Sequence, residues 1–119
     1  MSPHANDTVD LDTATEAFGV PHDAAAQSFL VDVRRAAVYE RADTLIPGAR
    51  WQDPTEPDAW IGTLPTDRPV VVYCVHGHEV SRGVVLRLRA AGLDARFLRD
   101  GIEGWKAAGR PLQAKEIAP

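Results

Sequence analysis

Two short runs of mainly apolar residues stand out along the chain, at positions 29–33 and 70–73. Neither run alternates regularly between apolar and polar positions, and both contain several valines. Continuous runs of this kind are typical of strands that are buried on both faces in a parallel sheet. The pattern therefore predicts two central strands with helices packed on both sides.

The second half of the chain changes to a helical spacing. Val84, Val85 and Leu88 would lie on one face of a helix, arginines would occupy the other face, and Gly92 would end it. This predicts a helix of about three turns that begins at Ser81. Similar signals predict helices at 36–42 and 102–108, a strand at 95–98, and a turn at 46–49 that leads to a short strand.

The remaining segments carry weaker patterns. Residues 12–28 are rich in alanine and predict a helix that is broken around residues 19–21, and residues 51–67 form a proline-rich connection with one helical turn at 56–61. The alternation of strands and helices in 119 residues predicts one α/β domain, residues 1–119. We expect a core at about 8–113 and loose tails at both ends.

The composition narrows the class of protein. Apolar residues make up 45% of the chain and charged residues 25%, and no apolar run approaches the roughly 20 residues that cross a bilayer. The net charge is −4 and the basic residues are dispersed, so we expect neither a nucleic acid nor a membrane as partner. The first ten residues do not resemble a signal peptide, which predicts a soluble, cytoplasmic protein.

The single cysteine, Cys74, directly follows the second apolar run and precedes the predicted helix. In open α/β sheets ligands bind beyond the carboxyl ends of the strands, where the next helix directs its unpaired amides and its positive dipole end. A thiol there ionises more easily, and Gly77 would let the loop curl so that successive amides face an anion. A buried structural cysteine is the alternative. A disulfide within the chain is excluded.

Several separated motifs resemble the rhodanese-like family. The segment Leu30-Val31-Asp32-Val33-Arg34 is similar to the family's central strand with its Asp-x-Arg ending, and Ile46-Pro47-Gly48-Ala49 resembles a stretch that follows. Residues 71–77 resemble the strand with its Cys-x-x-Gly loop, and residues 100–105 resemble the closing Gly-Gly-x-x-x-Trp motif. The family's Gly-His pair is replaced here by Thr44 and Leu45.

The resemblance implies a rhodanese-like fold, in which helices flank both faces of a central parallel five-stranded sheet. It also implies a thiosulfate sulfurtransferase, in which Cys74 carries a persulfide between a small anionic sulfur donor and a thiol or cyanide. Asp32 and Arg34 would support the active loop. No cofactor or metal is implied. The loop and the helix start would bind the substrate through Val75, His76, Gly77, His78, Glu79, Val80, Ser81 and Arg82.

The loop departs from the usual family pattern because it contains one additional residue. A loop of this length resembles Cys-x5-Arg enzymes that bind larger oxyanions, namely dual-specificity phosphatases and arsenate reductases. Val80 stands where their arginine would be, and phosphoryl transfer relies on such a cation. The alternatives to sulfur transfer are therefore an arsenate or chromate reductase, a phosphatase-like enzyme, or a non-catalytic regulatory module.

The loop side chains allow further expectations. We expect His76 to pack within the loop, His78 to lie near the rim, and Glu79 to face outward or to pair with an arginine. Arg82 is the nearest cation for thiosulfate, although it would equally suit a solvated helix face. Cys74, His76 and His78 are too few and too differently directed for a closed zinc site. The tryptophans are expected to pack: Trp105 on the sheet, and Trp51 and Trp60 in space-filling positions or at the pocket mouth.

Overall fold

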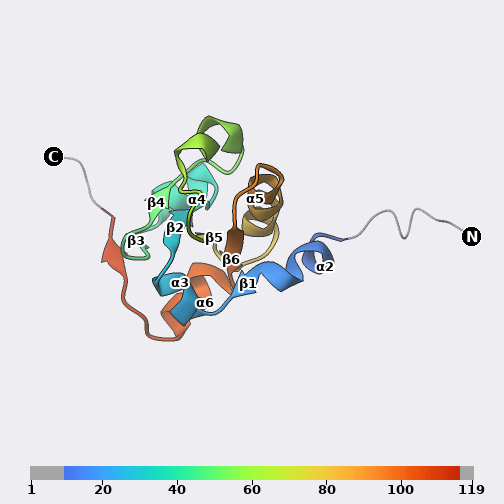
Figure 1. Cartoon of the computed structure of the whole chain (residues 1–119). Coiled ribbons are helices and arrows are strands. Elements are labelled where there is room, and N and C mark those ends of the chain that lie inside the picture. Colours follow the sequence, from blue (N-terminus) through green and yellow to red (C-terminus); the bar gives the residue numbers. More distant parts are fainter. Residues whose placement is uncertain (1–9, 116–119) are drawn as a thin grey trace, which may run out of the picture.

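The computed structural model describes residues 10–115 (Figure 1). Its centre is a five-stranded parallel sheet with the strand order β1-β6-β5-β2-β4. The sheet and its helices confirm the predicted α/β fold. The strands of this sheet are β1 (Gly19–Val20), β2 (Phe29–Asp32), β4 (Arg50–Trp51), β5 (Val70–Tyr73) and β6 (Ala95–Leu98).

Helices cover both faces of this sheet. In Figure 1, α3 and α6 lie next to each other in the lower part of the view, whereas α5 lies at the upper right. The α-helices are α2 (Leu11–Thr15), α3 (His22–Ala26), α4 (Ala36–Arg41), α5 (Glu79–Ala90) and α6 (Gly101–Ala107). Short 3₁₀ turns are η1 (Glu16–Phe18), η2 (Pro57–Ala59) and η3 (Ile61–Thr63). None of the helices in this described part of the chain has the length and apolar character needed to cross a bilayer.

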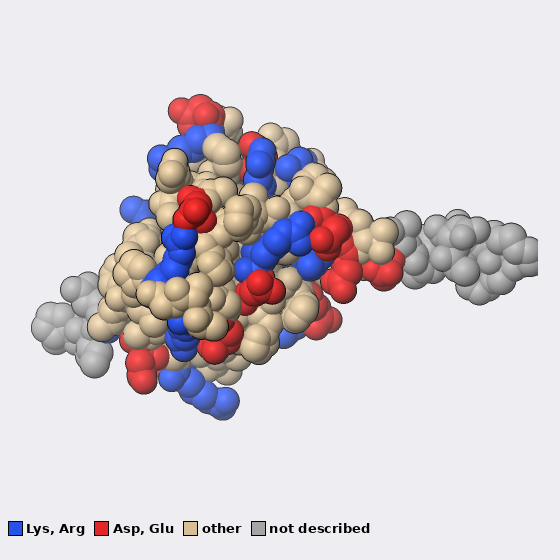
Figure 2. All heavy atoms as spheres, turned by 90° about the horizontal axis from the view of Figure 1, so that it is seen from below, with Lys and Arg blue, Asp and Glu red and all other residues tan. Residues whose placement is uncertain are grey.

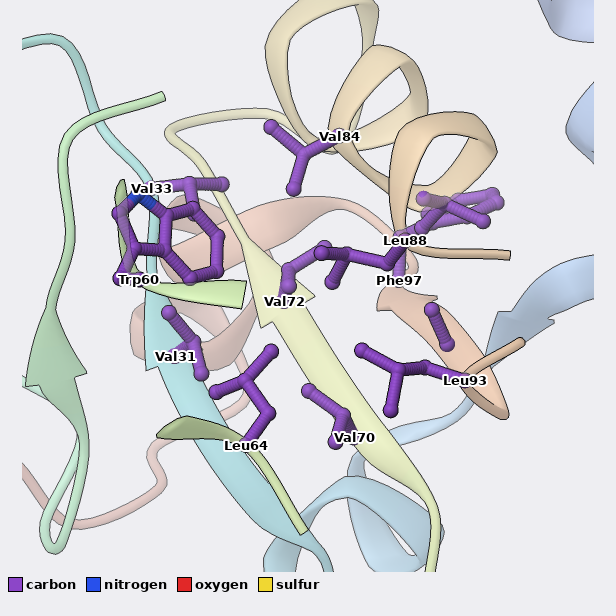
Figure 3. Packing of buried hydrophobic residues seen from close by; sticks show 12 residues of the cluster. Val31, Val33, Trp60, Leu64, Val70, Val72, Val84, Leu88, Leu93 and Phe97 are labelled. Atoms are coloured by element: carbon purple, nitrogen blue, oxygen red, sulfur yellow. The ribbon is translucent and has the colours of Figure 1, made fainter. Parts of the chain in front are cut away.

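Alternate residues of β5 pack into two separate cores. Val70 and Val72 point to the side of α5, where Val84 and Leu88 meet them (Figure 3). Val71 and Tyr73 point to the opposite side and pack with Ile102 of α6. Full burial of such a side chain contributes about 1.5–3 kcal/mol. The strand is therefore held from both faces, as its continuous apolar run predicts.

The register of β2 and β5 brings two strand ends together. Asp32 pairs with Tyr73, and the amide of Val33 donates to the Tyr73 carbonyl at 2.8 Å. Because parallel strands end at the same edge of the sheet, the segment after Asp32 and the segment after Tyr73 lie side by side. This edge contains Cys74.

The helix after the cysteine begins earlier than the sequence pattern predicts. Helix α5 starts at Glu79 with His78 as its N-cap residue, whereas the prediction placed the start at Ser81. The first turn of α5 is polar or weakly apolar and does not carry the helical spacing that marks the later turns. The irregular loop after Cys74 is therefore shorter than expected.

Three strands of two residues were not predicted. Strand β1 pairs with β6 at the sheet edge, where we expected only a break in a helix. The strand β7 (Gln113–Ala114) pairs antiparallel with β3 (Thr44–Leu45), so Ala114, just beyond the expected core limit at about 113, is not part of a loose tail. The predicted loose ends at 1–9 and 116–119 lie outside the described residues.

The charged side chains are intermixed on the face shown in Figure 2. Blue and red groups alternate there without an extended area of one sign. Among the described residues, ion pairs join Arg99 with Glu16 and Arg110 with Asp23. Many charged side chains are thus close to a group of opposite sign.

Candidate functional site

Cys74 lies at the carboxyl end of β5, between the sheet and the first turn of α5. Only 5% of the residue is exposed, and its Sγ lies 3.2 Å from the hydroxyl oxygen of Ser81. The carbonyls of Cys74 and Val75 accept hydrogen bonds from the amides of Ile102 and Glu103, each at 3.0 Å. The start of α6 thus fixes the backbone on which the thiol is carried.

Glycine at position 77 permits the close approach of the loop to the turn before α6. Gly77 has a φ of +75°, and a Cβ there would lie 2.8 Å from the Asp100 amide nitrogen. On the other side, a Cβ at Gly101 would lie 2.4 Å from the Val75 carbonyl oxygen. A side chain at either position would separate the two segments, so both glycines are required by the packing of this loop.

The backbone amides of the loop after Cys74 find no acceptor in the described part of the chain. Among the residues that the structure describes, no group accepts a hydrogen bond from the amides of residues 75–81. The first amide beyond them to be paired is that of Arg82, which donates to the His78 carbonyl at 3.2 Å. The N-terminus of a helix carries a partial positive charge, which α5 adds to these free donors. The loop is thus chemically suited to hold an anion beside the sulfur.

Cys74 is one of the residues that line a pocket of about 170 Å³. His76 and His78 are both exposed at its wall, and their ring centroids are 6.3 Å apart. We expected His76 to pack within the loop, and the structure shows that it does not. Glu79 is exposed and lies at the same wall. The residues that line the pocket are Arg34, Arg35, Val38, Cys74, Val75, His76, His78, Glu79 and Val80.

The side chain of Arg82 points away from this pocket. Its Nε donates to the Gly77 carbonyl at 3.0 Å, and its Nη1 donates to the Asp12 carbonyl at 3.1 Å and to the Thr15 hydroxyl at 3.2 Å. The guanidinium also lies over the ring of Phe97, 4.3 Å from its centroid. Arg82 does not line the cysteine pocket, where we expected it to bind the donor; it joins the loop to α2 instead.

Asp32 and Arg34 form a buried ion pair beside the loop. The Arg34 Nη2 lies 2.6 Å from the Asp32 Oδ2 and also donates to the Thr44 carbonyl at 2.9 Å. Burial alone would lower the pKa of Arg34, but the hydrogen bonds and the charge of Asp32 raise it above its usual value. The guanidinium therefore remains charged, and its Nε and Nη2 donors are engaged by Asp32 and by the Thr44 carbonyl.

Tyr73 completes this buried cluster. Its hydroxyl donates to Asp32 at 3.1 Å and accepts from the Ile46 amide at 3.1 Å. Burial and the neighbouring carboxylate raise the pKa of Tyr73, so the phenol stays protonated. The strand that ends at Cys74 is thus connected to the strand that ends at Asp32.

The three tryptophans have packing roles. Trp105 and Trp60 are buried, one in each core, and the Trp105 indole donates to the Pro111 carbonyl at 2.7 Å. Trp51 is partly buried, and its indole donates to the Arg34 carbonyl at 2.7 Å. Within the described residues, Cys74, His76 and His78 are not arranged as a metal site.

Two features of the pocket were missed by the sequence interpretation. Arg35 and Val38 line the pocket but received no role. Both lie just beyond the strand end at Asp32, which the parallel sheet places next to Cys74. The position of Arg35 directly after the Asp-x-Arg segment was the available signal.

The whole arrangement corresponds to a known family. The rhodanese-like domain family matches residues 14–108 of the sequence, and the chain belongs to this family. Membership supports a sulfurtransferase-like or related cysteine-based activity. No functionally curated protein matches the chain.

Solved structures resemble the chain over most of its length. A protein from Lactobacillus plantarum is 26% identical, with a TM-score of 0.72, and the match covers 95% of this chain and 99% of that one. A rhodanese-related protein from Thermoplasma volcanium is 21% identical, with a TM-score of 0.69 and coverage of 80% and 96%. A Rhodopseudomonas palustris protein of unknown function, described as a possible tyrosine phosphatase, is 24% identical, with a TM-score of 0.66 and coverage of 92% and 89%.

Proposed function

We propose that the protein is a sulfurtransferase that carries a sulfur atom on Cys74 as a persulfide. The observation that supports this most directly is that the amides of residues 75–81 have no acceptor among the described residues and lie beside a cysteine that lines a pocket. A persulfide and the oxyanion that leaves it are both anions, and such amides stabilise each of them. The donor is thiosulfate or a similar small anion.

In the first step the thiolate of Cys74 attacks the outer sulfur of the donor. A bond forms between the two sulfurs, the bond between the outer and the central sulfur of thiosulfate breaks, and its electron pair leaves with sulfite. The loop amides hold the negative charge as it moves, and the Ser81 hydroxyl lies within hydrogen-bond distance of the thiolate.

In the second step an acceptor attacks the outer sulfur of the persulfide. A thiolate acceptor becomes a persulfide and cyanide becomes thiocyanate, while the electron pair of the broken bond returns to Cys74. The enzyme therefore ends in its starting state without a net redox change. Because Cys74 must be a free thiol between cycles, we place the protein in a reducing compartment, the cytoplasm.

The surrounding residues support this chemistry without reacting. The ion pair of Asp32 with Arg34 and the hydrogen bonds of Arg82 to the loop hold the backbone in place. His76 and His78 are exposed at the wall and would contact the incoming anion. We assign the whole cycle to one rhodanese-like domain.

An oxyanion enzyme is the second candidate, favoured by the additional loop residue and by the Rhodopseudomonas palustris neighbour described as a possible tyrosine phosphatase. Against it, Val80 is partly buried at the position of the phosphate-binding arginine, and the guanidinium of Arg82 is engaged elsewhere. A phosphatase of this type needs a cation on the equatorial oxygens. Sulfur transfer needs only the amides, so we favour it.

The test is the intact mass of the reduced protein after incubation with thiosulfate and removal of small molecules. We expect a gain of one sulfur, about 32 Da, that cyanide removes and that the Cys74→Ser variant does not show. Circular dichroism of both proteins establishes that they are folded. A folded, reduced protein that gains no sulfur would contradict the proposal and would direct the same comparison to arsenate, chromate and phosphate esters.

A further inference from the structure

A second pocket of about 200 Å³ adjoins the cysteine pocket along the first turns of α5. The two pockets share Arg35, Glu79 and Val80 in their walls. The remaining walls come from the proline-rich connection and from the side of α5. They are formed by Pro54, Thr55, Pro57, Gly83, Val84 and Arg87.

The wall of this second pocket is rigidly built. Both the amide and the hydroxyl of Thr55 donate to the Asp53 carboxylate, at 2.9 and 2.7 Å, and the Trp60 indole donates to the Asp53 carbonyl at 2.8 Å. Trp60 is itself buried in the core under α5. Gly83 opens the opposite wall, since a Cβ there would meet no atom within 4 Å. The hollow is therefore a property of the fold and of the glycine.

One cation at the junction of the two pockets forms no ion pair with the described residues. Arg34 donates to Asp32 and Thr44, and Arg87 forms an ion pair with Asp58. Arg35 is exposed, lines both pockets, and forms no ion pair with any residue in the described range 10–115. Glu79 also lines both pockets, and its negative charge opposes an anion there.

We propose that the second pocket binds the body of the sulfur acceptor, a small thiol that bears a carboxylate, and that Arg35 binds this carboxylate. The inference rests on the proposed sulfur transfer. Thiosulfate and cyanide are small enough for the cysteine pocket alone, whereas an acceptor thiol carries a body that must lie beside it while its sulfur attacks the persulfide. The electron pair of the broken bond returns to Cys74, and the acceptor leaves as a persulfide.

The experiment compares two acceptors of the same shape. The Cys74 persulfide is formed, verified by mass, and then discharged by N-acetylcysteine, by its neutral amide, or by cyanide. We expect Arg35→Gln to lower the ratio of the N-acetylcysteine rate to the amide rate about three- to fivefold, in the range of an exposed ion pair. The matched control Arg41→Gln, an exposed arginine on the same helix that lines none of the described pockets, leaves the ratio unchanged.

Two further variants separate charge from shape. Glu79→Gln removes the opposing carboxylate and is expected to raise the ratio about twofold. Gly83→Leu fills the pocket at a helical position that favours a larger side chain, and is expected to slow both thiols about tenfold more than cyanide. An unchanged ratio in Arg35→Gln, or thiols slowed no more than cyanide in Gly83→Leu, overturns the inference.

A readout that needs no persulfide distinguishes this inference from the proposed function. Cys74 is alkylated with iodoacetate and with iodoacetamide, which differ by the same carboxylate. We expect Arg35→Gln to lower the ratio of these rates about threefold, and Arg41→Gln to leave it unchanged. If no persulfide forms but the ratio of iodoacetate to iodoacetamide rates falls in Arg35→Gln, the proposed sulfur transfer is wrong and the preference of Arg35 for carboxylates stands. If this ratio stays constant, the role of Arg35 is overturned.

Discussion

The two loops that follow β2 and β5 lie next to each other at one edge of the sheet and are opposite in their bonding. After β2, Asp32 and Arg34 engage each other and also Tyr73 and Thr44. After β5, the amides of residues 75–81 have no partner among the described residues. The Asp32–Arg34 pair is satisfied inside the protein, whereas the amides after β5 are left for a ligand.

This difference shows how the fold divides stability and function between neighbouring segments. Unpaired donors at a helix start reduce stability, because a fully paired alternative would be more favourable. The buried ion pair of Asp32 with Arg34 also accepts a hydrogen bond from Tyr73, and this contact holds the end of β5 in place. We therefore expect substitutions of Asp32 or Arg34 to act mainly on folding and those at residues 75–81 to act mainly on sulfur transfer.

The largest expected effect on stability comes from breaking the buried ion pair at the end of β2. Asp32→Ala leaves the Arg34 guanidinium buried without its carboxylate, and we expect a loss of about 3–5 kcal/mol in the free energy of unfolding. Urea denaturation followed by circular dichroism measures this. Asp58→Ala, which removes the exposed partner of Arg87, is the control and should cost at most about 1 kcal/mol. Equal losses would mean that the buried pair has no special role.

In the loop after β5 we expect a smaller effect on the free energy of unfolding and a large effect on persulfide formation. Gly77→Ala places a Cβ 2.8 Å from the Asp100 nitrogen, which moves the loop away from its position. We expect a cost of about 1–3 kcal/mol and a loss of most persulfide formation. Gly48→Ala is matched in φ but has open space around it, so it should form the persulfide at the normal rate. A normal rate in Gly77→Ala would show that the loop geometry is not required.

The hydrogen bonds by which Arg82 joins the loop after Cys74 to α2 should have an intermediate effect on persulfide formation. Arg82→Lys keeps the charge but removes the guanidinium group, whose Nε and Nη1 donate to the Gly77 carbonyl and to the Thr15 hydroxyl. We expect about a tenfold fall in the rate of persulfide formation with little change in thermal stability. Arg87→Lys, an exposed position on the same helix, is the control. A proportional loss of stability and rate would point to general unfolding instead.

The smallest effect concerns pH. The hydrogen bond from Arg99 and the one from Arg82 hold the pKa of Glu16 below its usual value of 4.5. A carboxylate with a lowered pKa in the folded state contributes stability above its unfolded pKa and loses it as the pH falls. Glu16→Gln should therefore flatten the decline in stability below pH 4.5, measured by urea denaturation at several pH values. A parallel decline in both proteins would contradict this.

The sequence predicts the central part of the fold because its signals are local. These signals lie close together in the sequence, between β5 and the end of α5. They are the valine run of β5, the single Cys74 after it and the helical spacing of α5, and the family motifs agree with them. The two-residue strands β1, β3 and β7 were missed because they depend on distant partners. Leu45 pairs with Gln113, and no local pattern marks either residue.

The site is predicted less completely than the fold for the same reason. Cys74 and its place at a strand end follow from local sequence, but the direction of the Arg82 side chain depends on Thr15, which lies 67 positions earlier. Arg35 gains its place at the pocket only when β2 and β5 are aligned. Side-chain direction is thus a tertiary property that a local pattern does not contain.

The hydrogen bond from Arg82 to the Asp12 carbonyl has a consequence for protein engineering. The family match begins at residue 14, so a segment cut at the family boundaries and grafted into another protein would lose this acceptor. It would also lose β7 and the bond from the Lys115 amide to the Asp43 carbonyl at 2.9 Å. A transplanted segment should therefore include at least residues 10–115, since the Asp10 carboxylate caps α2.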